Sequence, residues 1–100
     1  DLRAFKPTLG ALQRLEKPFA FVLNQTPPKS YRVRDTAEGL AVLGLISPVN
    51  VVMRNDHQDA IGMGQGVTEF NPTGAAAGEI RRLWDWVETR TKAIPHVKAA

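Results

Sequence analysis

The chain has 100 residues, a formal net charge of +3 at pH 7 and no cysteine. This length allows one small domain with a modest hydrophobic core, and the lack of cysteine excludes disulfides and thiolate metal sites. No apolar stretch approaches the roughly 20 residues of a membrane-spanning helix, and the mild positive charge permits an acidic partner without requiring one.

The first segment, residues 1–17, is predicted to be a helix. Its apolar side chains recur at helical spacing, at Leu2, Phe5, Leu9 and Leu12. Pro7 predicts either a kink or a fresh helix start near Thr8. We expect Pro18 to end the helix.

Residues 19–23 form an unbroken apolar run, which predicts a strand buried on both faces, as in a parallel sheet covered by helices. Asn24 follows, and we expect it at the carboxyl end of this strand, where open α/β sheets place their ligands. Its amide offers a donor and an acceptor together, which suits the edge of a purine base. An asparagine before two prolines is also ordinary turn chemistry, so both readings stay open.

After a loop at 26–30, a second helix is predicted over 32–43, with a capping-box pattern that favours a start at Asp35 and with Gly44 as its C-cap. The β-branched run at 49–53 predicts a second strand. Strand, helix and strand in this order predict a βαβ unit. Two parallel strands need neighbours, so the chain resembles half of an α/β domain, completed by another chain or by a missing part.

The remaining residues predict a short helix at 59–63, an extended segment at 67–70, a turn at 72–74 and a long helix at 75–93, followed by a frayed tail. The core face of the long helix is expected at Ala76, Ile80, Leu83, Trp84, Val87 and Thr91. Trp86 lies off that face.

Patterns for catalysis and metal binding are weak. Three glycines at 62, 64 and 66 lack the spacing and context of a phosphate-binding loop, and a tight turn explains them better. His57 lies among carboxylates, but further metal ligands at fixed spacing are missing, since His96 lies in the tail. No GxSxG nucleophile motif and no pair of acid–base carboxylates stand out. We predict no catalytic and no metal-binding residue in this chain.

Five short motifs occur in an order that resembles one family. They are FAFVLNQ at 19–25, RDTAEGL at 34–40, RNDHQDA at 54–60, GQGVTEFNP at 64–72 and AAAGEI at 75–80. Together they resemble the C-terminal part of ParA-type partition ATPases, the deviant Walker A group that also contains MinD and Soj. The resemblance implies an α/β fold, namely the C-terminal part of a parallel-sheet P-loop NTPase that lacks the P-loop half.

The resemblance also implies an ATP or ADP cofactor with Mg²⁺, bound between two subunits of a homodimer. Asn24 matches the asparagine that contacts adenine, with Gln25 beside it. Met53 and Arg54 match the next strand-end loop, which packs on the base; many relatives have proline where Arg54 stands. Asp1 resembles an aspartate near the nucleotide and the dimer interface.

Basic positions of the last helix resemble a face that contacts nonspecific DNA, at Arg81, Arg82, Arg90 and Lys92. The family further implies a ParB-like centromere-binding partner and a location in the bacterial cytoplasm, associated with the nucleoid. The KGGxGK[ST] loop of the family, which holds phosphates and Mg²⁺, does not occur here, so we expect no ATP hydrolysis by this chain alone.

Two other functions remain open. One is a non-enzymatic module that uses a remnant of the ParA fold to bind DNA or a partition partner. The other is a fragment of a MinD-like ATPase for cell-division positioning, whose sign would be a C-terminal membrane-targeting helix. The sequence disfavours the latter, because the tryptophan-bearing face of the last helix is expected to be core.

Overall fold

The structure is a computed structural model and describes residues 2–28 and 31–93. Its elements, in chain order, are α1 (Leu2–Arg14), β1 (Ala20–Phe21), β2 (Asn24–Thr26), α2 (Tyr31–Ala41), β3 (Leu45–Ile46), β4 (Val51–Val52), α3 (Asn55–Gly62), α4 (Val67–Phe70) and α5 (Ala75–Ala93). Asp1 and the predicted tail lie outside the described residues. No helix in the described ranges is long and apolar enough to cross a membrane.

Two extended stretches run parallel to each other and form the centre of the fold. β1 pairs with β3, with Ala20 opposite Leu45, and β2 pairs with β4, with Asn24 opposite Val51. The backbone N–H of Val51 donates to the carbonyl of Leu23 at 2.9 Å, so pairing continues between the two short ladders. The chain is therefore a mixed α/β structure in which α2 connects two parallel stretches.

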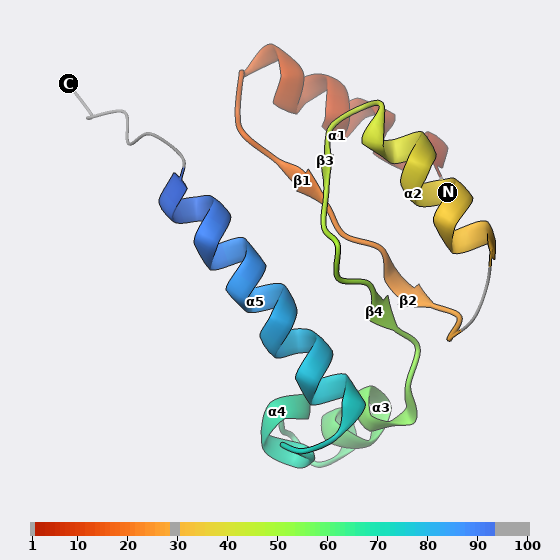
Figure 1. The fold of residues 1–100 in the computed structure, drawn as a ribbon, viewed down its shortest axis with the longest axis vertical. Coiled ribbons are helices and arrows are strands. Elements are labelled where there is room, and N and C mark those ends of the chain that lie inside the picture. Colours follow the sequence, from red (N-terminus) through yellow and green to blue (C-terminus); the bar gives the residue numbers. More distant parts are fainter. Residues whose placement is uncertain (1, 29–30, 94–100) are drawn as a thin grey trace.

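Helices lie on both sides of the strands (Figure 1). α1 and α2 lie on one side, where Phe5 of α1 packs edge-to-face on Phe21, with ring centroids 5.8 Å apart. α5 lies on the other side (Figure 1) and contacts β4. The strands are thus the middle of three layers.

A small apolar core forms where α3, α4 and α5 meet. Ala60, Val67 and Ala76 are buried there, and Phe70 and Ile80 pack against them. These side chains are small, and none of the larger described side chains is fully buried. The best-packed part of the chain is therefore this helical corner, below the strands in Figure 1.

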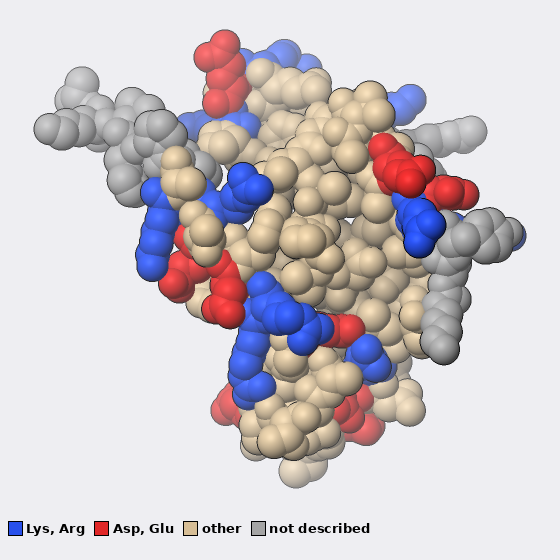
Figure 2. Space-filling model, viewed as in Figure 1, with Lys and Arg blue, Asp and Glu red and all other residues tan. Residues whose placement is uncertain are grey.

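Several large apolar side chains remain exposed, namely Leu15, Val22, Val42, Leu43, Leu45, Met53, Ile61, Met63 and Trp84. Val22 and Leu45 belong to the central strand stretches, so the prediction of a strand buried on both faces is wrong within the described residues. No third strand pairs with either stretch in the described ranges. Figure 2, which has the same view as Figure 1, shows an area without charged side chains near the centre of the molecule.

The first helix ends earlier than predicted and for a different reason. α1 continues through Pro7 and ends at Arg14, four residues before Pro18. Glu16 has a φ of 53°, and the N–H of Lys17 donates to the carbonyl of Leu12 at 3.1 Å. This is the hydrogen-bond pattern of a Schellman motif, which closes the helix before the proline is reached.

Other elements also differ from the predictions. α2 begins at Tyr31 instead of 32 or 35, α3 begins at Asn55 instead of 59, and β3 lies in a segment not predicted as a strand. Residues 67–70 are helical instead of extended, because the Glu69 carboxylate accepts the N–H of Gly66 at 3.1 Å and closes the first turn. The boundaries of α5 are as predicted.

The two tryptophans of α5 exchange the expected places. Trp84 is 60 % exposed, although it was predicted on the core face. Trp86 is half-buried and lines a hollow of about 490 Å³ with Phe19 and Leu45, near the start of β1 and β3. The rest of the predicted core face is largely confirmed, because Ala76 is buried and Ile80, Leu83 and Val87 are half-buried, so Trp84 and Thr91 are the residues that depart from it.

Replacing Gly74 by alanine is expected to destabilise the fold. An added Cβ would lie 2.6 Å from Asn71 Nδ2 and 2.9 Å from Asp56 Oδ2, and would separate a pair whose hydrogen bond spans 3.1 Å. We expect Gly74→Ala to lower the free energy of unfolding by about 1 kcal/mol, because the half-buried Asn71 and Asp56 would lose their hydrogen bond. Urea unfolding followed by circular dichroism measures this loss.

Gly39→Ala is the matched control. An added Cβ at Gly39, inside α2, has no neighbour within 4 Å, so alanine should stabilise the helix by about 0.5–1 kcal/mol. Equal stability of Gly74→Ala and the unaltered chain would contradict the assigned role of Gly74.

Candidate functional site

The carboxyl ends of β2 and β4 lie next to each other and form the edge on which the sequence predicts a ligand. The N–H of Met53 donates to the carbonyl of Thr26 at 2.8 Å. Asn24 and Gln25 therefore belong to the strand that pairs with β4, and Met53 and Arg54 directly follow the end of β4.

Asn24 does not end its strand, contrary to the prediction. It is the first residue of β2, opposite Val51, and pairing continues to Thr26, opposite Val52. Gln25 is an extra residue in this ladder and has a φ of 54°, the left-handed region. This β-bulge carries the strand two residues beyond Asn24.

The Asn24 side chain is exposed, and its Oδ1 accepts the N–H of Gln25 at 2.9 Å. That bond is the local turn chemistry left open in the sequence analysis. The acceptor is thus partly engaged, and the NH₂ group faces solvent as a donor. Gln25 is also exposed.

Met53 and Arg54 have different environments. Met53 is 62 % exposed. It borders a hollow of about 470 Å³ whose lining is Met53, Arg54, Asn55, Asp56, Ala75 and Ala76. Arg54 Nη2 donates to Glu79 Oε2 at 2.9 Å and its Nε donates to Glu79 Oε1 at 3.2 Å. The Arg54 side chain is therefore bound to Glu79 of α5. Its neighbour Met53 presents an exposed apolar side chain.

Glu79 is the residue that the sequence analysis missed. It is 6 % exposed, and its Oε1 also accepts the N–H of Val52 at 3.3 Å. Hydrogen bonding from Arg54 is the main cause that lowers the pKa of Glu79, helped by Val52 and Arg82, while desolvation opposes it. The same hydrogen bond raises the pKa of Arg54.

A signal for Glu79 was present in the sequence. It lies three residues after Ala76 and four before Leu83, so helical spacing places a carboxylate on the core face of α5. A buried carboxylate requires a partner of opposite charge or several hydrogen-bond donors. An arginine directly after the predicted second strand was the available candidate.

The four basic residues predicted to contact DNA lie along α5, on exposed positions. Three have partners within the chain: Arg81 donates to the carbonyl of Pro72, Arg90 lies over the Trp86 ring at 5.6 Å, and Lys92 pairs with Glu88 at 3.1 Å. Figure 2 shows acidic and basic side chains interspersed on the face it presents. Exposed contacts of this kind contribute little energy, so they leave these side chains available to a stronger partner.

No group of three or more metal-ligating side chains occurs in residues 2–28 and 31–93. His57 Nε2 is buried and has no hydrogen-bond partner there.

No family model, curated protein or solved structure matches the chain. The resemblance to ParA-type ATPases therefore rests on the sequence motifs alone.

The Glu79–Arg54 pair predicts a pH-dependent stability. Because the folded-state pKa of Glu79 lies below the ordinary value of 4.5, the carboxylate stabilises the fold above that pH. This contribution is lost as the pH falls through the lower folded-state pKa. We expect the melting temperature to fall from about pH 5 to pH 3 more steeply in the unaltered chain than in Glu79→Gln.

Glu88→Gln provides the control, because the pair that Glu88 forms with Lys92 is exposed. Its melting temperature should follow that of the unaltered chain across the same range. Parallel curves for Glu79→Gln and the unaltered chain would show that Glu79 does not carry the acid dependence.

Proposed function

We propose that this chain is the C-terminal part of a ParA-type partition ATPase and supplies one edge of the pocket for the adenine base. One observation carries the proposal: two parallel strands joined by α2 bring the segments with Asn24 and Met53 to adjacent ends. These segments are also the ones that resemble the family's base-contacting motifs.

The chemistry of this edge suits a base. The exposed NH₂ group of Asn24 can donate to a ring nitrogen, and the exposed Met53 offers a polarisable apolar surface for a planar ring. In the ATPase, bound ATP with Mg²⁺ supplies the phosphoryl group that is transferred to water. The residues of this chain would only hold and orient the base.

The exposed apolar side chains support the second part of the proposal, that further strands and helices complete the sheet. Val22 is 37 % and Leu45 is 40 % exposed, both in the central stretches. Strands of a parallel sheet are normally covered on both faces. A phosphate-holding half of the ATPase domain would bury this surface and place the phosphates near the carboxyl edge.

Adenosine binding tests the proposed base edge. In an NMR titration of the ¹⁵N-labelled chain, adenosine is expected to shift the amides of Asn24, Gln25 and Met53, and Asn24→Ala is expected to abolish the response. MgATP should bind no more tightly than adenosine, because the family's phosphate loop does not occur in the sequence.

Gln58→Ala, which removes an exposed amide from α3, is the control and should leave the titration unchanged. Unshifted Asn24 and Met53 amides at the solubility limit of adenosine would contradict the proposed base edge. Tight binding that depends on Mg²⁺ would contradict the division of the nucleotide site between this chain and another part.

DNA contact by α5 is the remaining part of the proposal. If Arg81 and Arg82 contact phosphates, the double variant to glutamine should weaken binding to a mixed-sequence duplex and reduce the slope of log K against log salt by about 2. Fluorescence anisotropy at several salt concentrations measures both. Arg14→Gln, on α1, should leave the slope unchanged, and an equal loss in both variants would contradict the assignment to α5.

A further inference from the structure

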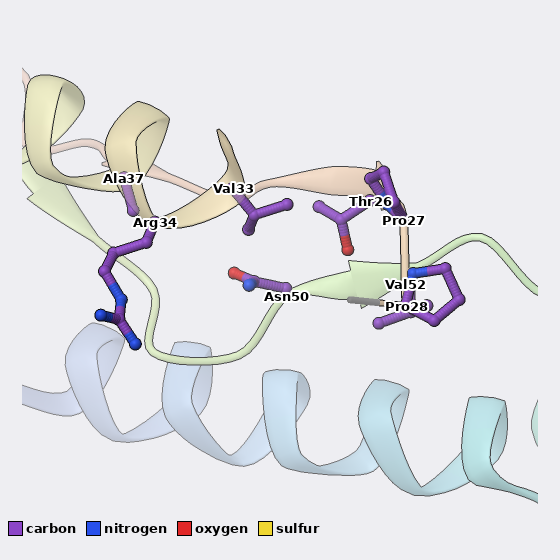
Figure 3. A pocket seen from close by; sticks show the side chains of 8 residues that line it. All are labelled: Thr26, Pro27, Pro28, Val33, Arg34, Ala37, Asn50 and Val52. Atoms are coloured by element: carbon purple, nitrogen blue, oxygen red, sulfur yellow. The ribbon is translucent and has the colours of Figure 1, made fainter. Parts of the chain in front are cut away.

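A hollow of about 260 Å³ lies between α2 and the carboxyl ends of β2 and β4. Its lining residues are Thr26, Pro27, Pro28, Val33, Arg34, Ala37, Asn50 and Val52 (Figure 3). It is separate from the base edge, since it contains neither Asn24 nor Met53. Its volume is just below the roughly 300–1,000 Å³ of pockets for drug-sized ligands, so it fits a small molecule.

Three polar side chains from three different elements line this hollow. Thr26 comes from β2, Arg34 from the first turn of α2, and Asn50 from the loop before β4. Figure 3 shows the Asn50 amide between the Thr26 hydroxyl on one side and the Arg34 guanidinium on the other. An apolar pocket with a few polar groups in its wall is typical of a binding site.

None of these three side chains has a hydrogen-bond or ion-pair partner among the described residues. For Arg34 this is ordinary, because it is exposed. Thr26 is only 7 % exposed as a residue, but its hydroxyl is not among the buried polar atoms without a partner. The hydroxyl is therefore accessible from the hollow that Thr26 lines and can donate to a ligand there.

The hydrogen-bond donors in the wall of the hollow favour a negatively charged ligand. A guanidinium donates through a planar fork that matches a carboxylate or phosphate, and the hydroxyl and amide can donate to further oxygens. The remaining wall is apolar, formed by Val33, Ala37 and Val52 with the two prolines.

We propose that this hollow binds a small oxyanion, a carboxylate or a phosphate ester, carried on a short apolar body. Arg34 pairs with the anionic head group, Asn50 and Thr26 donate to its oxygens, and the apolar wall packs against the body. The site does not depend on the proposed ATPase function, because it shares no residue with the adenine edge.

Benzoate and phenyl phosphate are suitable probes, with benzamide as the neutral counterpart of nearly the same shape. In NMR titrations of the ¹⁵N-labelled chain, one or both anions are expected to shift the amides of Val33, Asn50 and Val52 saturably. Benzamide should bind at least tenfold more weakly. Tighter binding of phenyl phosphate would assign a phosphate ester, and tighter binding of benzoate would assign a carboxylate.

Arg34→Gln is expected to weaken anion binding at least tenfold, and the isosteric Thr26→Val should weaken it without loss of the fold, as the amide spectrum reports. Arg14→Gln removes the same charge from α1 and should change nothing. Equal binding of benzamide, unchanged affinity in Arg34→Gln or no saturable shift up to the solubility limit would overturn the proposal. The readout amides differ from those of the adenosine titration, so failure of one proposal is distinguishable from failure of the other.

Discussion

The hydrogen bonds of Glu79 are the constraint on which the arrangement of the described elements depends. Its carboxylate accepts from the backbone of β4 at Val52 and from the side chain of Arg54, which directly precedes α3. One buried anion therefore joins α5, β4 and the start of α3. The buried apolar residues beside it on α5, Ala76 and Ala77, are small, so each buries little apolar area. Charge-assisted hydrogen bonds are stronger than neutral ones, and here they fix the crossing of α5 over the strands.

The apolar surface of the strands requires a different account from the helical corner. The corner of α3, α4 and α5 buries its own core, whereas Val22 and Leu45 remain exposed although they belong to the central stretches. Burying apolar area stabilises a fold by about 25 cal/mol per Å², and parallel sheets normally obtain this on both faces. Within the described residues the strands bury only part of their apolar surface, so they gain only part of this stabilisation. A covering partner for this surface is the simplest physical completion of the fold, and the ATPase proposal names one.

The sequence predicts well what depends on local pattern. The long helix of residues 75–93, the parallel strand pair and the connecting helix all follow from periodicity, β-branched runs and glycine or proline positions. Predictions failed where a tertiary contact or a backbone conformation decides. Residues 67–70 look extended by composition, but the Glu69 carboxylate and the burial of Val67 make them helical. Trp84 follows the helical stripe of α5 yet is exposed, whereas Trp86 joins Val87 of that stripe in the hollow beside Phe19 and Leu45. Asn24 looks like a strand end, because no residue pattern announces the bulge at Gln25.

That bulge explains how one strand end presents two different surfaces. In a regular strand, residues 24 and 26 would point to the same face, because side chains alternate with a period of two. Here Asn24 pairs with Val51 and Thr26 with Val52, and adjacent residues of β4 point to opposite faces. Asn24 and Thr26 are thereby separated: the first is exposed and the second is buried in the wall of the hollow under α2. A left-handed conformation at a non-glycine residue costs free energy and concentrates at functional positions. The left-handed conformation of Gln25 is thus the physical link between the proposed adenine edge and the proposed oxyanion hollow.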